Sequence, residues 1–229
     1  AQLLADKRDQ DFVIWEQMNG EACLKSGPYS GYDRKMCDMI LTEARTLAVK
    51  EVLPTLAEGD REGLHFENGV VRVPECFHRP FELIVEGGWN NLGVPEEMGG
   101  QGAPPFITAA AVEYLMAANY ALFIYSSMGN GTADMIHKFG TPEQRAAYVG
   151  NLTSAKWGGT MLLTEPDAGS DVGALTTSAV RNEDGTYSLT GNKIFITNGE
   201  YDLVENIIHP VLARIEGDPP GTKGITLFI

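Results

Sequence analysis

Cysteine is scarce in this sequence, and its three residues form no recognisable pattern. Cys23, Cys37 and Cys76 lie far apart, without CxxC spacing. An odd and scattered set makes a poor disulfide framework and a poor zinc site. We therefore expect reduced thiols, as in proteins of the cytoplasm, and we expect this protein to be cytoplasmic.

Closely spaced histidines are missing as well. No H-x-x-x-H pair and no carboxylate-rich cluster accompanies the four histidines, which are His65, His78, His137 and His209. Lone histidines on the surface or in the core explain them better than a metal site does. We predict that the chain binds no metal.

Clustered positive charge is absent too. The chain has 17 Lys and Arg against 31 Asp and Glu, which gives a formal net charge of −14. This charge repels a phosphate backbone, so we expect no nucleic-acid partner. An anionic nucleotide cofactor is still compatible with the composition, because backbone amides bind phosphate without any net positive charge.

Long apolar runs are lacking. No run approaches the roughly 20 residues that a membrane-spanning helix needs. The N-terminus, AQLLADKRDQDF, does not have the basic-then-apolar order of a secretory signal. We expect no membrane span. Apolar residues still make up 43% of the 229 residues, which is enough material for a buried core.

The hydrophobic pattern changes near residue 156. Before it, apolar residues recur at helical spacing, and after it short β-rich runs alternate with turn signals. We predict a helical domain over residues 1–156 and a β domain over residues 157–229. Because the chain stops at Ile229 inside the strand-like run ITLFI, we expect the natural protein to continue.

Four helices are predicted in the first part. One carries Tyr32 to Val52 and ends at Pro54, since proline breaks a helix interior. The others start at Pro74, at Phe106 and at Thr141. The Phe106 helix is long and apolar to Tyr125, and the Thr141 helix opens with a Thr-Pro-Glu-Gln capping box.

The second part is predicted to contain short strands. A Gly-Asn turn at residues 191–192 predicts a hairpin between the third and fourth of them. The strand-like runs are Trp157–Thr164, Thr176–Arg181, Tyr187–Thr190, Lys193–Thr197, Ile207–Ala213 and Gly224–Ile229.

Two segments in this part carry groups suited to a ligand. In Thr164–Asp171, a strand end is followed by a Pro/Gly/Ser loop that can form an anion-binding nest, with Gly169 allowing positive φ. In Lys193–Gly199, Phe195 and Thr197 would share one face of a strand. Taken singly, an ordinary loop and a core phenylalanine explain these residues better than a ligand site does.

Taken together, the two segments resemble the acyl-CoA dehydrogenase family. The family pattern Thr-Glu-x-x-small-Gly-Ser-Asp is met at Thr164–Asp171, and a Trp-Ile-Thr-Asn-Gly-like pattern at Phe195–Gly199. A hairpin of the family's type lies between them at Asp184–Lys193, and Leu92–Gly102 is similar to segments before the family's long helix. The resemblance covers about Tyr32–Ile229, and the end of the chain resembles the family's larger, longer-chain subgroup.

The resemblance implies a multidomain fold of α and β type. An N-terminal all-α helical domain is followed by a β-barrel-like middle domain, and the family's C-terminal four-helix domain would be absent from this chain. FAD would lie between the middle and C-terminal domains, with an acyl-CoA thioester against the flavin. The family also suggests a homo-oligomer.

The resemblance also implies roles for individual residues. Thr164 and Thr197 would hydrogen-bond the flavin ring, and Phe195 would lie near it. Met161 and Leu163 would add backbone or packing contacts. In the loop after Glu165, Gly169 and Ser170 would serve the cofactor, with Ser170 reaching a pyrophosphate or CoA phosphate oxygen.

Two positions depart from the family pattern. Phe195 stands where many members have tryptophan, and Leu162 stands where a smaller residue is more frequent. Phenylalanine still packs against an isoalloxazine face, although with less area and no indole donor. Neither change removes a hydrogen-bonding group, so flavin binding remains the expectation.

The implied reaction is α,β-dehydrogenation of an acyl-CoA to the enoyl-CoA, with electrons passed to an electron-transfer flavoprotein. The family's base is a Glu that we expect beyond Ile229. Glu165 should point away from a flavin that Thr164 faces, because adjacent strand residues face opposite sides. We interpret Glu165 as a structural carboxylate, assign no catalytic residue to this chain, and expect the chain alone to be inactive.

Other functions fit the same sequence. An acyl-CoA oxidase or a flavin monooxygenase would keep the fold and change the chemistry, and oxygen-dependent peroxide formation would reveal an oxidase. A noncatalytic flavin- or acyl-CoA-binding relative would be a yellow protein that no acyl-CoA bleaches. A damage-response relative that touches DNA is disfavoured by the negative charge.

Overall fold

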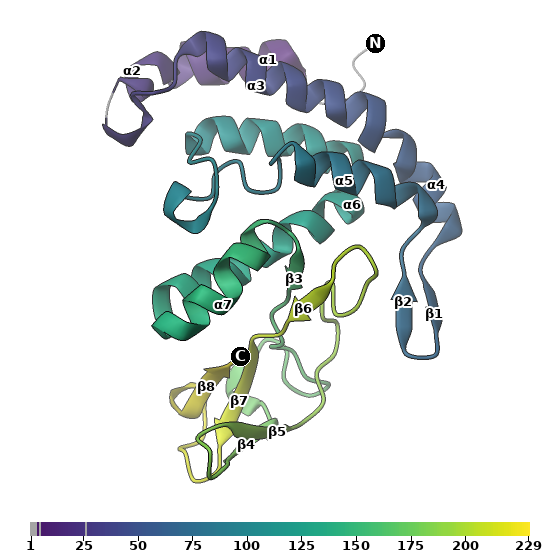
Figure 1. The fold of residues 1–229 in the computed structure, drawn as a ribbon, viewed down its shortest axis with the longest axis vertical. Coiled ribbons are helices and arrows are strands. Elements are labelled where there is room, and N and C mark those ends of the chain that lie inside the picture. Colours follow the sequence, from purple (N-terminus) through teal and green to yellow (C-terminus); the bar gives the residue numbers. More distant parts are fainter. Residues whose placement is uncertain (1–3, 5, 26) are drawn as a thin grey trace.

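The computed structural model describes residue 4, residues 6–25 and residues 27–229. Helices make up one part of the molecule and most of the strands lie together at its other end (Figure 1). The helices are α1 (Lys7–Asp11), α2 (Gly20–Leu24), α3 (Arg34–Leu47), α4 (Pro54–Glu62), α5 (His78–Glu86), α6 (Pro105–Phe139) and α7 (Pro142–Thr153). The strands are β1 (His65–Glu67), β2 (Val70–Arg72), β3 (Trp157–Gly159), β4 (Ser178–Arg181), β5 (Tyr187–Thr190), β6 (Asn206–Ile208), β7 (Val211–Ile215) and β8 (Ile225–Phe228).

The helical part followed by a sheet-containing part confirms the predicted fold class. The domain boundary at residue 156 stays a prediction. The helical part also contains the small β1–β2 hairpin, which the sequence analysis missed. Asn68 and Gly69 form its turn with φ of 52° and 83°, and Asn-Gly is a strong hairpin signal.

The first predicted helix does not end at Pro54, so that prediction was wrong. From α3 the chain passes through a π-helical turn, Ala48–Val52, and α4 then begins at Pro54 itself. Leu53 keeps helical angles, φ −56° and ψ −40°. Proline suits the first turn of a helix because its missing N–H has no partner to lose there.

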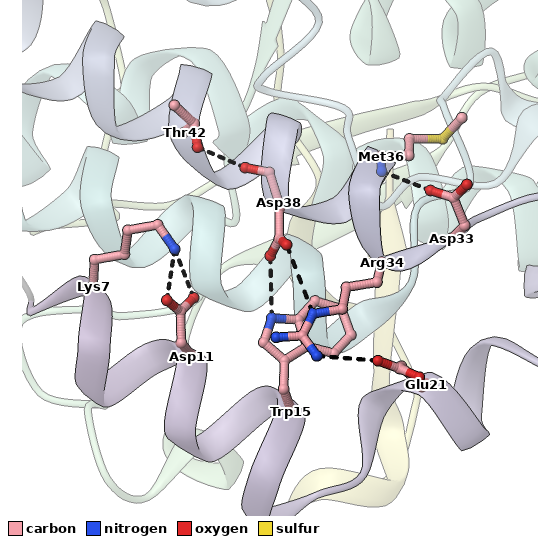
Figure 2. A network of polar contacts seen from close by, with 9 residues as sticks. All are labelled: Lys7, Asp11, Trp15, Glu21, Asp33, Arg34, Met36, Asp38 and Thr42. Carbon is pink, nitrogen blue, oxygen red and sulfur yellow. Dashed lines mark hydrogen bonds and ion pairs between the residues drawn. The ribbon is translucent and has the colours of Figure 1, made fainter.

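The N-terminal helices are held to α3 by the polar contacts drawn in Figure 2. The Trp15 indole donates a hydrogen bond to Asp38 Oδ1 at 3.1 Å. The Arg34 guanidinium lies over the Trp15 ring, 5.0 Å from its centroid, and donates to Glu21. Buried Gln10 reaches the Ala110 carbonyl of α6, so this segment packs on the helical core.

Helix α6 is longer than the predicted Phe106–Tyr125, and it is broken once. Asn119 has non-helical angles, φ −161° and ψ 96°. Its side-chain oxygen accepts a hydrogen bond from Leu122 N at 3.1 Å, while its nitrogen donates to Thr55 Oγ1 at 2.9 Å. Asn119 therefore caps the second half of α6 from within the core, where it is almost fully buried.

The predicted apolar face of α6 is buried, and α6 packs against α3, α5 and α7. Among the described residues, α6 alone is long and apolar enough to cross a membrane by length and composition. Half of its most apolar stretch is buried inside the protein, and core helices have the same composition. The absence of a membrane span stays a prediction.

The predicted start of α7 is confirmed, whereas Pro74, the expected first residue of the helix before it, is extended, and α5 begins at His78 after a 3-10 turn at Glu75–Phe77. Helical structure follows Pro74, and α5 ends before Gly87. The Thr141 hydroxyl accepts a hydrogen bond from Gln144 N, and the Gln144 side chain accepts one from Thr141 N at 2.8 Å. This reciprocal capping box satisfies two backbone donors that the first turn of a helix leaves unpaired.

The strands after residue 156 form two sheets. Strands β3 and β6 pair in parallel, and a four-stranded sheet has the order β5-β4-β7-β8. Within it β4 pairs with β7 in parallel, whereas the other neighbours are antiparallel. The predicted run Ile207–Ala213 is divided at residues 209–210 between the two sheets.

The hairpin predicted at residues 191–192 does not form, and residues 193–197 are not a strand. The β4–β5 hairpin turns instead at the Asn182–Gly185 segment. A Cβ added at Gly191 would come within 2.6 Å of the Thr177 Cβ. Gly191 lies opposite Thr177, one step beyond the Ser178–Thr190 pair of the β4–β5 ladder, where a side chain would clash.

Replacing Asn119 with alanine should destabilise the protein, because two buried hydrogen bonds are lost at the break in α6. We expect a loss of about 1–3 kcal/mol in the free energy of unfolding. Urea unfolding measures it. Asn151→Ala, which removes an amide that bonds within α7, is the matched control and should change little. Equal stability of the two variants would contradict the capping role.

Candidate functional site

The two sequence segments lie side by side in the structure. Ile194 N donates a hydrogen bond to the Thr164 carbonyl at 3.0 Å. The Lys193 ammonium donates to the Leu163 carbonyl at 3.1 Å. Leu162 pairs in turn with Val211 of β7, so the first segment is tied to the four-stranded sheet.

The second segment is also tied to the helices. The Asn198 amide donates to the Ile124 carbonyl of α6 at 3.0 Å. The Tyr201 hydroxyl donates to the Tyr125 carbonyl at 3.2 Å, and the two tyrosine rings lie 4.7 Å apart. Burial raises the pKa of Tyr201 well above its usual range, so the hydroxyl stays a neutral donor. Helix α6 therefore supports the segment from one side.

Phe195 is held out of the protein rather than in its core. Its side chain is 89% exposed, and its φ of 58° lies in the left-handed region. Such a conformation costs a non-glycine residue about 1–3 kcal/mol and marks functional sites in many proteins. The alternative of a core phenylalanine is therefore wrong. The prediction that Phe195 and Thr197 share one face of a strand is wrong as well, because residues 193–197 form no strand.

The remaining predicted residues are accessible at this location. Met161, Leu163 and Thr164 are half-buried, and Thr197 is exposed. The half-buried state leaves part of each side chain open to a ligand. In the loop after Glu165, the predicted Gly169 and Ser170 are exposed as well.

The loop after Thr164 differs from the predicted nest. Glu165 N donates to the Ala168 carbonyl and Ala168 N donates to the Glu165 carbonyl, so these amides already have partners. Gly169 does not adopt positive φ, contrary to the prediction. A Cβ there would meet nothing within 4 Å, so nothing within the described chain requires glycine at this position.

Glu165 is buried, as the interpretation of a structural carboxylate required, and it is the most heavily bonded side chain near the site. It accepts hydrogen bonds from the amides and hydroxyls of Thr176 and Thr177, at 2.5 to 3.0 Å. Lys193 donates to it at 2.9 Å. Burial acts to raise the pKa of Glu165, but these bonds outweigh it and hold the pKa well below the usual range.

Sequence reasoning missed the partners of Glu165. Lys193 was assigned to a strand, and Thr176 and Thr177 were placed only in a β-rich run. His209, expected to be a lone surface or core histidine, is half-buried, and its Nδ1 lies 2.9 Å from the buried Thr160 hydroxyl, a partner that the sequence does not reveal. Burial lowers the pKa of His209 and so favours the neutral imidazole, and it outweighs Glu200, which acts to raise that pKa. No sequence spacing links these groups, because they meet through the folding of separate strands.

A cavity of about 540 Å³ lies elsewhere, between the C-terminal end of α6 and the four-stranded sheet. The described residues that line it include Ile136, Phe139, Leu189 and Phe228, and none is an acid, a histidine or a lysine. It offers no carboxylate, imidazole or ammonium group for acid–base chemistry. Within the described ranges, no three His, Cys, Asp or Glu side chains are arranged to hold a metal. The candidate site is therefore at the two segments.

Two family models match the chain in succession. The acyl-CoA dehydrogenase N-terminal domain matches residues 35–156, and the acyl-CoA dehydrogenase middle domain matches residues 160–229. The two matches follow the order of the helical and sheet-containing parts.

Curated relatives carry the same family name. The broad-specificity linear acyl-CoA dehydrogenase FadE5 of Mycobacterium tuberculosis is 40% identical over 96% of this chain and 36% of its own length. The 3-methylmercaptopropionyl-CoA dehydrogenase of Ruegeria pomeroyi is 42% identical over 78% of this chain and 30% of its own. The chain thus spans about a third of the length of these relatives.

A solved structure shows the same fold. The acyl-CoA dehydrogenase of Bacillus anthracis, complexed with FAD, is 26% identical to this chain. It aligns with a TM-score of 0.66 over 86% of this chain and 30% of its own.

Stability should depend on pH through Glu165. Its pKa is depressed in the folded protein, so its stabilising contribution is complete above the unfolded pKa of about 4.3 and declines as the pH falls below it. Glu165→Gln leaves Lys193 without its counter-ion and should cost about 3–5 kcal/mol at pH 7.

Thermal unfolding at stepwise lower pH measures this effect. The difference in melting temperature between wild type and Glu165→Gln should shrink as the pH falls below about 4.3. Exposed Glu205→Gln is the control and should stay close to wild type throughout. A difference that is the same at pH 7 and in acid would show that the charge of Glu165 does not stabilise the fold.

Proposed function

This chain belongs to the acyl-CoA dehydrogenase family, and we propose that the protein binds FAD and dehydrogenates an acyl-CoA thioester to the enoyl-CoA. One observation carries the proposal: segments 30 residues apart meet through the Ile194–Thr164 hydrogen bond and present accessible groups there. The relative of known structure that is complexed with FAD supports the choice of cofactor.

The residues at the site suit a planar, hydrogen-bonding ring. The exposed ring of Phe195 offers an apolar face, and aromatic faces stack well on planar rings. The hydroxyls of Thr164 and Thr197 both donate and accept hydrogen bonds, as the edge of an isoalloxazine requires. We assign these three residues to the flavin ring, and Met161 and Leu163 to packing or backbone contacts beside it.

The loop after Glu165 suits the phosphate end of the cofactor. Gly169 has ordinary φ and open space around it, so the reason for glycine lies outside the described chain. Close approach of a ligand to the backbone is such a reason. We assign Gly169 to this approach and the exposed Ser170 hydroxyl to a phosphate oxygen.

The cofactor, when bound, supplies the hydride acceptor, and the chain supplies its binding and orientation. The α-proton needs a carboxylate with an open lone pair and a pKa near the working pH. Glu165 has neither, because five donors occupy it and its pKa is strongly lowered. We therefore place the base in a part of the protein outside this chain, and we assign no catalytic residue here.

The electron acceptor we propose is an electron-transfer flavoprotein, as the family resemblance implies. The same site would also serve an oxidase, which passes electrons to oxygen. A homo-oligomer and a cytoplasmic location remain part of the proposal. The net charge of −14 supports the expectation that nucleic acid is not a partner.

The full-length protein should be yellow, and a saturated acyl-CoA should bleach its flavin absorbance without oxygen present. Diluting the reduced protein into air distinguishes the two electron acceptors. An oxidase forms peroxide at once, whereas a dehydrogenase forms little peroxide and reduces an added electron-transfer flavoprotein. A yellow protein that a panel of saturated acyl-CoAs of different chain length leaves oxidised would contradict the proposed reaction.

Variants at the site test the assignments. Thr164→Val and Thr197→Val each remove a hydroxyl while keeping the side-chain shape, and each should weaken FAD binding by about tenfold. Gly169→Ala should fold normally, since its Cβ meets open space, and should also weaken FAD binding. Half-buried Thr46→Val on α3, whose hydroxyl bonds only the helix backbone, is the control. Unchanged FAD affinity in all three site variants would refute the location of the site.

A further inference from the structure

We propose that Lys193 is a positioning residue of the flavin site, which holds Thr164 in place through Glu165 and the Leu163 carbonyl. The inference rests on the proposed function, because it concerns the orientation of a residue assigned to the flavin. Lys193 and Glu165 form a buried ion pair, with side chains 7% and 3% exposed and 2.9 Å between Nζ and Oε1.

The geometry of the pair centres on Thr164. Lys193 Nζ donates to the carbonyl of Leu163, directly before Thr164, and to the carboxylate of Glu165, directly after it. The next residue, Ile194, donates its amide to the carbonyl of Thr164 itself. Lys193 and Ile194 thus donate hydrogen bonds to all three residues from Leu163 to Glu165.

Glu165 extends this connection to a third stretch of chain. Its two oxygens receive the amides and hydroxyls of Thr176 and Thr177, which precede β4. The residues before β4 therefore bind Glu165, and Glu165 forms the ion pair with Lys193. Lys193 in turn donates hydrogen bonds to the residues on both sides of Thr164. Gly191, two residues before Lys193, lies against the Thr177 side chain, and a side chain at residue 191 would clash there.

The same contacts fix the second segment. Lys193 is two residues before Phe195, whose exposed ring stands on a backbone of positive φ. A strained residue keeps its conformation only when its neighbours are held firmly. The Lys193 anchor on one side and the Asn198 bond to α6 on the other provide that support.

The presence of the ion pair does not by itself show that it serves stability. A buried ion pair is weak evidence for stability, because replacing both partners with neutral groups is frequently tolerated, while removing one leaves an unpaired buried charge. A role in positioning and a role in stability therefore make different predictions for single and double variants.

The experiment uses the full-length protein loaded with FAD and compares Lys193→Met with the double variant Glu165→Gln/Lys193→Met. Lys138→Met is the matched control, because Lys138 forms an exposed pair with Asp134. Melting temperature, FAD affinity of the apoprotein and the flavin absorbance spectrum are measured for each variant. Lys193→Arg tests whether a longer cation restores the contacts.

We expect Lys193→Met to lose both thermal stability and FAD affinity, the latter by about tenfold or more. The double variant should regain part of the stability because no unpaired charge is left, although the glutamine NH2 then faces a backbone N–H, and it should keep the weak FAD binding and an altered flavin spectrum. Lys193→Arg should recover part of the affinity. Lys138→Met should match wild type in every measurement.

The proposal is overturned if FAD affinity and spectrum return to wild type together with stability in the double variant, since the pair would then be purely structural. It is also overturned if the double variant does not fold, because the pair would be needed for the fold itself. A wild-type protein that binds no FAD would refute the proposed function instead, which separates the two failures.

Discussion

The carboxylate of Glu165 is the group on which the arrangement of the candidate site depends. Removed from water, it is stabilised by four donors from Thr176 and Thr177 and by the Lys193 ammonium. These partners come from separate stretches of chain, so satisfying one buried charge brings the stretches together. A buried carboxylate without such partners would be costly, which makes the arrangement specific.

Helix α6 also binds the second segment of the candidate site through two backbone carbonyls. Helix α6 accepts the Asn198 side chain and the Tyr201 hydroxyl through carbonyls of Ile124 and Tyr125, just after the break at Asn119. Residues beside a helix break are held by the Asn119 cap and its Thr55 partner rather than by the regular ladder alone. Contacts at Lys193 and at Asn198 thereby fix the second segment on both sides of Phe195 along the chain, and Phe195 is exposed between them.

Local chemistry predicted much of the fold. The capping box at Thr141, the apolar face of α6 and the sheet-containing second part followed from spacing and turn residues. Predictions that required tertiary knowledge were wrong: Pro54 begins a helix, and the Gly-Asn pair at residues 191–192 makes no hairpin, since residues 193–197 form no strand and Ile194 bonds Thr164 instead. The burial of Glu165 agrees with its interpretation as a structural carboxylate, but its partners could not be predicted, since they meet only after folding.

The central claim is that Thr164, Phe195 and Thr197 form one half of a flavin site. A crystal structure of the full-length protein with bound FAD tests it most directly. The account predicts the isoalloxazine ring against Phe195, with the hydroxyls of Thr164 and Thr197 at hydrogen-bonding distance from its edge. A flavin bound elsewhere, with these three side chains in contact with solvent or with protein alone, would contradict it.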